Sequence, residues 1–274
     1  MKRTTYSVVI PALNEEKFLP NLLASLAKQS HRNFEVIVVD GKSQDNTVTV
    51  AKTYSQSLPK LTVCIADHAS LPYQRNLGAE HAEGEWIIFV DADSVLLPYA
   101  LESIDAYIRQ HNPLFLTAWF KPDSDIPNDA VLTLLGNIFL EWSKIIHRPL
   151  APGPFTAVKK EIFQKVGGYD VDHPFLEDQD FSQRMTKLGI VLHIIRETLC
   201  VFSLRRYRKQ GTLKILQAYA KAIIPIFIAK KTPKNMKGYV MGGQMFTDKQ
   251  YKVKKSILKV YEQKIKRLMR ELFE

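Results

Sequence analysis

WIIFVDADSV, at residues 86–95, is an apolar run that ends in two aspartates, Asp91 and Asp93. Its hydrophobic core, Ile87–Val90, predicts a strand buried on both faces, which is typical of a parallel sheet. Alternate side chains of an extended segment point the same way, so both carboxylates should face one point at the carboxyl end of the sheet. Carboxylate oxygens suit a hard cation, Mg²⁺ or Mn²⁺, shared with a ligand's phosphates. The alternative is a polar turn after the strand.

The sequence before this stretch alternates strands with helices. Apolar runs predict strands at residues 7–10, where Pro11 should end the strand, at 34–39 and at 61–66. Helices are predicted between them at residues 18–26, from about Thr47, and at 77–83. The order β-α-β-α-β-α-β predicts a parallel, right-handed, Rossmann-like sheet.

The remaining sequence continues this mixture of strands and helices. The segment GGYDVDHPFLEDQDF, residues 167–181, is predicted to be a loop. Helices are expected at residues 101–111, 130–146, 160–166 and 181–188, and strands at 113–120, 155–158, 191–195 and 198–202.

Three strand ends carry polar residues that a scaffold does not need. They are PALNE at residues 11–15, DGKS at 40–43 and DAD at 91–93. Because the carboxyl ends of parallel strands meet at one edge of the sheet, we expect these segments to line one cleft. An aspartate there can accept hydrogen bonds from a nucleobase or a ribose. Asp40 alone could equally be a helix N-cap or a turn former.

Composition and charge indicate a folded α/β protein with a basic C-terminal part. The 274 residues are 46% hydrophobic, and Cys64 and Cys200 lie in apolar runs, as expected of reduced core cysteines. The N-terminal apolar run is too short for a signal peptide. From Arg205 onward there are 19 Lys and Arg residues but only four Asp and Glu residues. This asymmetry favours an anionic partner surface, either membrane or nucleic acid.

With these motifs in place, the chain resembles a family 2 glycosyltransferase of the GT-A fold, a Rossmann-like mixed, mainly parallel sheet flanked by helices. The resemblance covers roughly residues 6–211 and implies a glycosyltransferase domain at 1–211, followed by a basic, amphipathic helical region at 212–274. The matching segments are SVVIPALNEE at 7–16, VIVVDGKSQDNT at 36–47, QRNLGAEHAEGEWIIFVDADS at 74–94, GGYD at 167–170, LEDQDFSQRM at 176–185 and SLRRYRKQG at 203–211.

The resemblance implies a site for a nucleoside-diphosphate sugar of the UDP or GDP type. Asp91 and Asp93 would hold the ribose and a Mn²⁺ or Mg²⁺ that bridges the diphosphate, Asp93 most directly. Arg205 and Arg206 would assist at the diphosphate, because arginine binds phosphate in a bidentate manner, unless they are solvated surface residues. The implied nucleotide-sugar-binding residues are Pro11, Ala12, Asn14, Glu15, Asp40, Gly41, Ser43, Arg75, Asp91, Ala92, Glu177, Arg205 and Arg206.

An inverting transferase also needs a general base for the acceptor hydroxyl. Asp178 occupies the Glu-Asp position of the family and is the predicted catalytic base. The neighbouring carboxylates of Glu177 and Asp180 should raise its proton affinity through like-charge repulsion. The alternative is that Asp178 and Asp180 cap the following helix.

Two motifs of processive family members are missing from this sequence, which narrows the expected kind of sugar transfer. The QxxRW motif of processive synthases is absent, and there is no pair of long transmembrane runs, so transfer of single sugars to a glycan or lipid-linked hydroxyl is expected. The runner-up is a polyprenyl-phosphate glycosyl synthase, whose acceptor phosphate needs little base assistance. Some relatives use a histidine as a further metal ligand, but His193 lies in an apolar strand and is predicted to be a core residue.

The C-terminal region leaves two interpretations open. Residues 213–229 form an apolar segment with two lysines and a proline, at the lower length limit for spanning a bilayer. It is either an interfacial helix, with the basic tail on anionic headgroups, or a helix that packs on the core. We therefore expect a cytoplasmic protein, which under the first interpretation is peripheral on the inner face of the cell membrane.

Two other classes of protein would account for parts of the sequence. FVDADSV also fits the first motif of haloacid-dehalogenase-like phosphatases, with Asp91 as nucleophile and Asp93 as general acid, but that motif belongs on the first strand. A nucleic-acid-binding protein would use the basic tail, yet the tail has no aromatic stacking platform. No nucleic-acid partner is expected.

Overall fold

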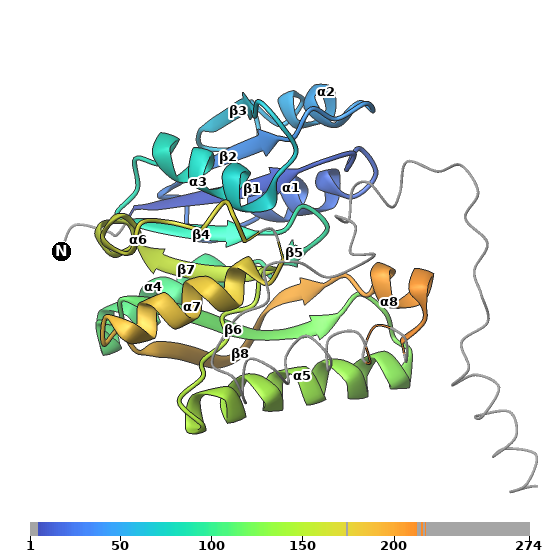
Figure 1. The fold of residues 1–274 in the computed structure, drawn as a ribbon. Coiled ribbons are helices and arrows are strands. Elements are labelled where there is room, and N and C mark those ends of the chain that lie inside the picture. The colour runs from blue at the N-terminus through green and yellow to red at the C-terminus, as the bar shows by residue number, and fades with distance from the viewer. Residues whose placement is uncertain (1–4, 174, 213–214, 216, 218–274) are drawn as a thin grey trace, which may run out of the picture. The chain divides into compact units, whose positions relative to one another are not determined.

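The computed structural model describes residues 5–173, 175–212, 215 and 217 (Figure 1). The strands are β1 (Tyr6–Ala12), β2 (Phe34–Asp40), β3 (Leu61–Ile65), β4 (Trp86–Val90), β5 (Val95–Leu96), β6 (Phe115–Pro122), β7 (Phe155–Lys159) and β8 (Leu192–Phe202). The helices are α1 (Leu19–Ala27), α2 (Thr47–Lys52), α3 (Leu71–His81), α4 (Ala100–His111), α5 (Pro127–Ile145), α6 (Lys160–Val166), α7 (Glu177–Lys187) and α8 (Arg205–Gln210).

The strands form one sheet in the order β3-β2-β1-β4-β7-β6-β8-β5. Strands β1 to β4 are mutually parallel, β7 pairs antiparallel with β4 and β6, and β5 pairs antiparallel with β8. The prediction of a mixed, mainly parallel GT-A sheet is therefore confirmed. The carboxyl ends of β1, β2 and β4 lie at the same edge.

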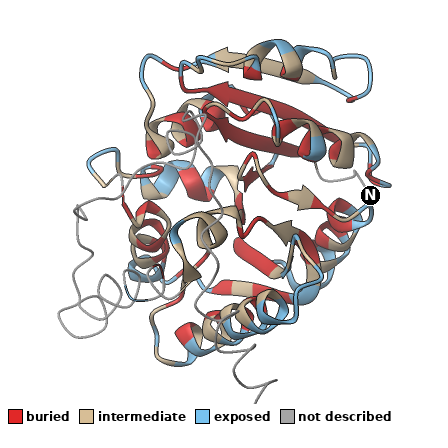
Figure 2. Cartoon of the chain, turned by 90° about the vertical axis from the view of Figure 1, so that its right-hand side faces the viewer, coloured by how far each residue is buried: buried red, intermediate tan, exposed pale blue. Residues whose placement is uncertain are grey.

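Helices cover both faces of the sheet, and the buried strands lie between them (Figures 1 and 2). Leu22 and Leu26 of α1 and Ile104 of α4 pack on one face. Ala79 of α3 and Phe181 of α7 pack on the other. Successive residues of the central strands face opposite sides, which is why their sequences are continuously apolar.

The structure corrects four sequence predictions. Strand β1 does not end before Pro11 but continues to Ala12, where it still pairs with β2. A proline is tolerated there because the pairing of β1 with β4 already ends at Val9, so β4 offers no carbonyl that would need the N–H that proline lacks. The predicted loop at 167–181 is too long, since α7 begins at Glu177. The two last predicted strands are one strand, β8, with register shifts in its pairing with β6. The short strand β5 was not predicted.

The described residues belong to two units. One contains the sheet and extends to Ser203, and the other begins at Leu204 and contains α8. The apolar segment 213–229 and the basic tail lie outside the described residues, apart from Ile215 and Gln217. None of the helices in the described part of the chain is both long and apolar enough to cross a bilayer.

Candidate active site

Gln74 of α3 joins the ends of β1 and β2. Its Nε2 donates to the carbonyl oxygens of Ala12, at 2.9 Å, and Val39, at 2.8 Å. The backbone N–H of Gly41 also donates to the Ala12 carbonyl, at 2.8 Å. A Cβ at Gly41 would lie 2.9 Å from Oε1 of Gln74, so a larger residue there would displace the Gln74 amide from these hydrogen bonds. The structure thus brings the predicted segments 11–15 and 40–43 together.

The carboxylate of Asp40 has one buried oxygen without a partner. Its Oδ2 accepts the backbone N–H of Ser43 at 2.9 Å, whereas its Oδ1 has no hydrogen-bond donor within the described part of the chain. An unsatisfied buried acceptor costs about 1–3 kcal/mol, which a donor on a bound ligand can offset. This oxygen is the feature of β2 that most directly indicates a ligand.

Asn14 and Glu15 hold the loop after β1 against the loop after β2. Asn14, at a positive φ of 53°, accepts the N–H of Gln44 through its Oδ1 and donates its own N–H to Ser43 Oγ. The N–H of Glu15 donates to Oγ1 of Thr47 at 2.8 Å. These contacts therefore fix the loop after β1 beside the loop that follows Asp40.

Asp91 and Asp93 lie in a turn directly after β4. The N–H of Ser94 donates to the Asp91 carbonyl at 3.0 Å, so the segment from Asp91 to Ser94 is a turn and not an extended strand. The expectation that the two side chains point the same way assumed an extended backbone and therefore no longer applies. Both side chains are partly exposed, with buried Ala92 between them. Two carboxylates at a sheet edge suit Mg²⁺ or Mn²⁺ when a diphosphate supplies the remaining oxygens.

Arg75 of α3 connects Asp91 to Glu177 from a fully buried position. Its Nη2 donates to Asp91 Oδ1 at 3.0 Å and to the Gly153 carbonyl at 3.3 Å, and its Nη1 donates to Glu177 Oε1 at 2.8 Å. Its guanidinium also lies 5.1 Å from the ring centroid of Tyr169. Burial alone would lower the pKa of Arg75, but Tyr169 and the surrounding carboxylates raise it, so the charge is retained.

The hydrogen bonds of Arg75 give it a positioning role within the protein. Both of its Nη atoms donate to groups of the protein, so it is placed to hold Asp91 and Glu177 in position. Its part in binding the nucleoside diphosphate, which the family resemblance implies, stays a prediction. Burial raises the pKa of Glu177, while Arg75 lowers it and Asp178 adds to the rise.

Asp178 lies in the first turn of α7 and is half-buried. Its Oδ2 accepts the N–H of Gly153 at 3.0 Å, and its Oδ1 accepts the N–H of Gln179 at 2.8 Å. Burial raises the pKa of Asp178 and Asp91 adds to the rise, against the opposing effects of Arg75 and the two backbone donors. A carboxylate with raised proton affinity suits a general base.

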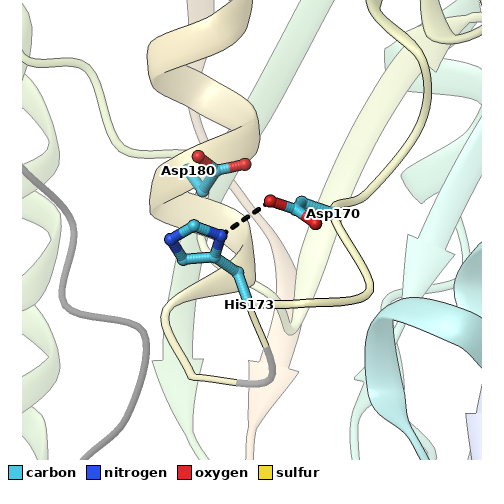
Figure 3. Close-up of side chains that lie close together, drawn as sticks. All are labelled: Asp170, His173 and Asp180. Atoms are coloured by element: carbon cyan, nitrogen blue, oxygen red, sulfur yellow. Dashed lines mark hydrogen bonds and ion pairs between the residues drawn. The ribbon is translucent and has the colours of Figure 1, made fainter.

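The carboxylate of Asp180, which was expected to repel that of Asp178, forms an ion pair with the guanidinium of Arg184. Nε of Arg184 donates to its Oδ2 at 2.7 Å, which offsets its charge. Asp180 also lies within 4.8 Å of Asp170 and His173, a group that could hold a metal ion (Figure 3). His173 Nδ1 already pairs with Asp170 Oδ2 at 2.7 Å. Because both aspartates already have a charged or polar partner, we interpret the group as two internal pairs, His173 with Asp170 and Arg184 with Asp180.

Three site residues were not identified from the sequence. Gly153 contacts both Arg75 and Asp178 through its backbone, but it lies in no recognised motif. Tyr169 lies in the GGYD segment and Gln74 in the longer segment 74–94, and neither pattern assigns them a role. A Cβ at Gly153 would lie 2.7 Å from Arg75 Nη2, which no local pattern reveals.

The other sequence predictions have mixed outcomes. His193 lies half-buried in β8 with Tyr107 at 3.3 Å, and burial lowers its pKa, as expected of a core histidine. Cys200 is buried and Cys64 half-buried, and neither forms a disulfide. Arg205 and Arg206 lie on α8 in the second unit, so their contact with the diphosphate stays a prediction.

A mixed, mainly parallel sheet with an unsatisfied buried carboxylate and two further aspartates at the carboxyl ends of its strands is typical of nucleotide-binding α/β enzymes. Comparison with known families agrees: the model of glycosyl transferase family 2 matches residues 7–167. An uncharacterized glycosyltransferase of Haemophilus influenzae is 30% identical over 207 residues, which are 73% of this chain and 69% of that protein. The chain belongs to glycosyl transferase family 2, which decides against the phosphatase alternative.

Other relatives define the fold further. The poly(ribitol-phosphate) β-N-acetylglucosaminyltransferase TarS of Staphylococcus aureus is 36% identical over 110 residues, which are 39% of this chain and only 19% of that protein. The structure of its residues 1–349 with UDP-GlcNAc has a TM-score of 0.61 at 26% identity, over 73% of this chain and 58% of that one.

A second solved structure is similar in fold alone. The mannosyltransferase PcManGT of Pyrobaculum calidifontis, in complex with GDP-Man and Mn²⁺, has a TM-score of 0.64 at 22% identity. The match covers 84% of this chain and 70% of that one. The GT-A fold is thus established from sequence family and from structure.

Proposed function

We propose that this protein transfers a single sugar from a nucleoside-diphosphate sugar to an acceptor hydroxyl, with inversion at the sugar carbon. The observation that carries the proposal is the link through Arg75 and Gly153. Arg75 binds Asp91 on the donor side, and the N–H of Gly153, whose carbonyl accepts from Arg75, binds Asp178 on the acceptor side. One proposed donor-side carboxylate, Asp91, and the proposed base, Asp178, are thus linked through Arg75 and Gly153.

The donor side is supported by the chemistry of the strand ends. Oδ1 of Asp40, which has no donor within the described part of the chain, would accept an N–H of the nucleobase, and the segment 11–15 is held against the loop after Asp40. Asp91 and Asp93 would hold the Mn²⁺ or Mg²⁺, which when bound neutralises charge on the departing diphosphate. That TarS, at 26% identity, binds UDP-GlcNAc supports a donor of the UDP type.

On the acceptor side, Asp178 takes the proton of the incoming hydroxyl. The oxygen then bonds to the sugar carbon as the bond to the diphosphate breaks on the opposite face. Gly153 N–H orients one carboxylate oxygen of Asp178. Arg205 and Arg206 are proposed to counter charge on the leaving diphosphate.

The basic C-terminal sequence supports a further part of the proposal. We propose a cytoplasmic enzyme whose acceptor is lipid-linked or close to the membrane, because 19 Lys and Arg residues against four Asp and Glu residues from Arg205 onward favour an anionic surface.

Donor binding can be tested with UDP-, GDP- and TDP-sugars in the presence of Mn²⁺. A donor at about 100 times its Kd should stabilise the wild type by about 2.7 kcal/mol, or roughly 5–10 °C in melting temperature. The variant Asp93→Ala should no longer respond, because it loses a metal ligand. The exposed Asp125→Ala is the matched control and should respond like the wild type. Equal stabilisation of wild type and Asp93→Ala would show that the metal assignment is wrong.

A further inference from the structure

The ring of Tyr169, in the GGYD segment, packs on the guanidinium of Arg75 in the interior of the protein. Tyr169 is 2% exposed and Arg75 is fully buried. The central carbon of the guanidinium lies over the face of the ring, 5.1 Å from its centroid. A cation over an aromatic face is attracted by the ring quadrupole, and the attraction is stronger when both groups are desolvated. The ring is therefore a favourable neighbour for a charge that burial disfavours.

Two consecutive residues of α3 contact Tyr169. Asn76 directly follows Arg75, and its Nδ2 donates to the carbonyl of Tyr169 at 2.8 Å. The Oδ1 of Asn76 accepts the N–H of Tyr169, also at 2.8 Å. Gly168 makes this pair of bonds possible, because it has a positive φ of 65° and a Cβ there would lie 2.7 Å from Asn76 Oδ1. The backbone of Tyr169 is thus fixed to the helix from which Arg75 extends.

The hydrogen bonds of Arg75 leave one edge of its guanidinium without a partner. Nη1 and Nη2 donate to Glu177 and Asp91, whereas Nε is buried and has no hydrogen-bond partner among the described residues. Contact with the face of a packed ring blocks movement of the guanidinium in that direction. The ring of Tyr169 therefore adds a restraint that the hydrogen bonds do not supply.

An aromatic cluster in turn holds the ring of Tyr169. The ring stacks on Phe181 at 4.7 Å between centroids, and it meets Phe89 edge to face at 5.2 Å. Phe163 belongs to the same cluster, with its centroid 5.8 Å from that of Tyr169. Of these four described rings, the one that packs on the guanidinium of Arg75 is that of Tyr169. The cluster thus offers both a test position and a control position.

We propose that Tyr169 is a positioning residue for sugar transfer. Asn76 holds its backbone, and its ring keeps the guanidinium of Arg75 in place. That guanidinium connects the donor-side Asp91 to the base Asp178 through Gly153, so the ring acts on both sides of the site without touching a substrate. The inference rests on the proposed function and extends it to a residue outside the proposed binding and catalytic groups.

The rate of sugar transfer by Tyr169→Leu tests this role. The variant lacks the ring face, so Arg75 should move and kcat should fall by up to roughly 10²-fold. Tyr169→Phe keeps the ring and should retain kcat to within a few-fold. Phe163→Leu is the matched control, because it removes a ring from the same cluster and leaves the ring on Arg75 in place. It should also retain kcat.

The pH profile separates a positioning role from a general loss of packing. Arg75 lowers the pKa of Asp178. When the ring of Tyr169 is missing and the guanidinium moves away, that pKa should rise, and the acidic limb of kcat should shift to higher pH. Glu177 and Asp91, the other charged groups that act on this site, are unchanged in the variant. The limb of the control variant should stay at the position of the wild type.

A measurement without substrate follows the side chain of Arg75 directly. Its buried Nε–H should give a proton–nitrogen NMR signal, which is identified by its absence in Arg75→Lys. Nitrogen relaxation should report a rigid side chain in the wild type, Tyr169→Phe and Phe163→Leu, and a more mobile one in Tyr169→Leu. Asn76→Ala keeps all rings of the cluster and should also raise the mobility. It takes the place of Tyr169→Leu if that variant does not fold.

Three results overturn the inference. One is an Arg75 side chain that stays as rigid in Tyr169→Leu as in the wild type. Another is an acidic limb that Phe163→Leu shifts as far as Tyr169→Leu does. The third is an equal loss of rate in Tyr169→Phe and Tyr169→Leu, which would assign the role to the hydroxyl. Failure of the proposed function is distinguishable, since the wild type would then transfer no sugar while the relaxation measurement still decides whether the ring holds Arg75.

Discussion

Replacing Asp178 with asparagine is expected to lower kcat by roughly 10²–10⁴-fold. The amide oxygen can still accept the N–H of Gly153, so the local structure should persist, but the amide cannot take a proton. Donor affinity should change little because the donor-side residues Asp40, Asp91 and Asp93 are unchanged. Initial rates and donor titrations measure the two quantities separately.

Asp180→Asn is the matched control for this variant. Asp180 lies two residues further along the same helix and is paired with Arg184, so its removal should change kcat by only a few-fold. If Asp178→Asn kept the full rate, a hydroxyl acceptor would be excluded, and the polyprenyl-phosphate alternative would be favoured.

The pH profile gives a second measurement of the same group. Because burial raises the pKa of Asp178, kcat should be high above that pKa and fall as the pH decreases through it. This acidic limb should lie at higher pH than for an exposed aspartate, and it belongs to the coupled pair Glu177 and Asp178. The limb should persist in Asp180→Asn.

Replacing Arg75 with leucine is expected to lower the free energy of unfolding by about 3–5 kcal/mol, since it leaves buried carboxylates without a partner. For a domain of this size, that is a fall in melting temperature of roughly 6–20 °C. Activity should also fall, because Asp91 and Glu177 lose their positioning group. Thermal unfolding and initial rates measure both effects.

Arg196→Leu is the matched control for Arg75. Arg196 also makes two hydrogen bonds to a carboxylate, but its side chain is 72% exposed, so its loss should cost no more than about 1 kcal/mol. Similar losses for the two variants would mean that the buried link does not hold the site together.

The pH dependence of Arg75→Leu follows from the sign of the pKa shift. The pKa of Glu177 is higher in the folded than in the unfolded protein. At a pH above the unfolded pKa, the ionised carboxylate of Glu177 therefore destabilises the folded state. This cost disappears as the pH falls. The variant should therefore recover stability between about pH 8 and pH 5, whereas Arg196→Leu should not.

The strands were predictable from local sequence, and the start of α7 was not. Buried parallel strands have continuous apolar runs, so β1, β2 and β4 were located to within a few residues. Helix α7 begins after Leu176, at a φ of 56° and without a side-chain N-cap, so the usual start signal is missing. The acidic residues of its first turn, Glu177, Asp178 and Asp180, were the remaining signal, because carboxylates favour a helix N-terminus.

Two strands were predicted where the structure has one, β8, because exposed charged residues interrupt its apolar sequence. Arg196 and Glu197 interrupt its apolar run, which predicted two strands. Both residues are exposed, and Arg196 pairs with Glu141 of α5, so the strand continues without burying a charge. The pairing with β6 absorbs the irregularity through register shifts between Ala118 and Phe120.

The sequence by itself determined the alternation of strands and helices, the polar strand ends and the family. Each of these depends on residues close together in the chain, where periodicity and motifs carry the information. Only the tertiary structure decided that Arg75 joins Asp91, 16 residues away, to Glu177, 102 residues away. Such contacts arise because packing on the sheet brings α3 and α7 to the same edge, and a buried guanidinium must then find carboxylates there.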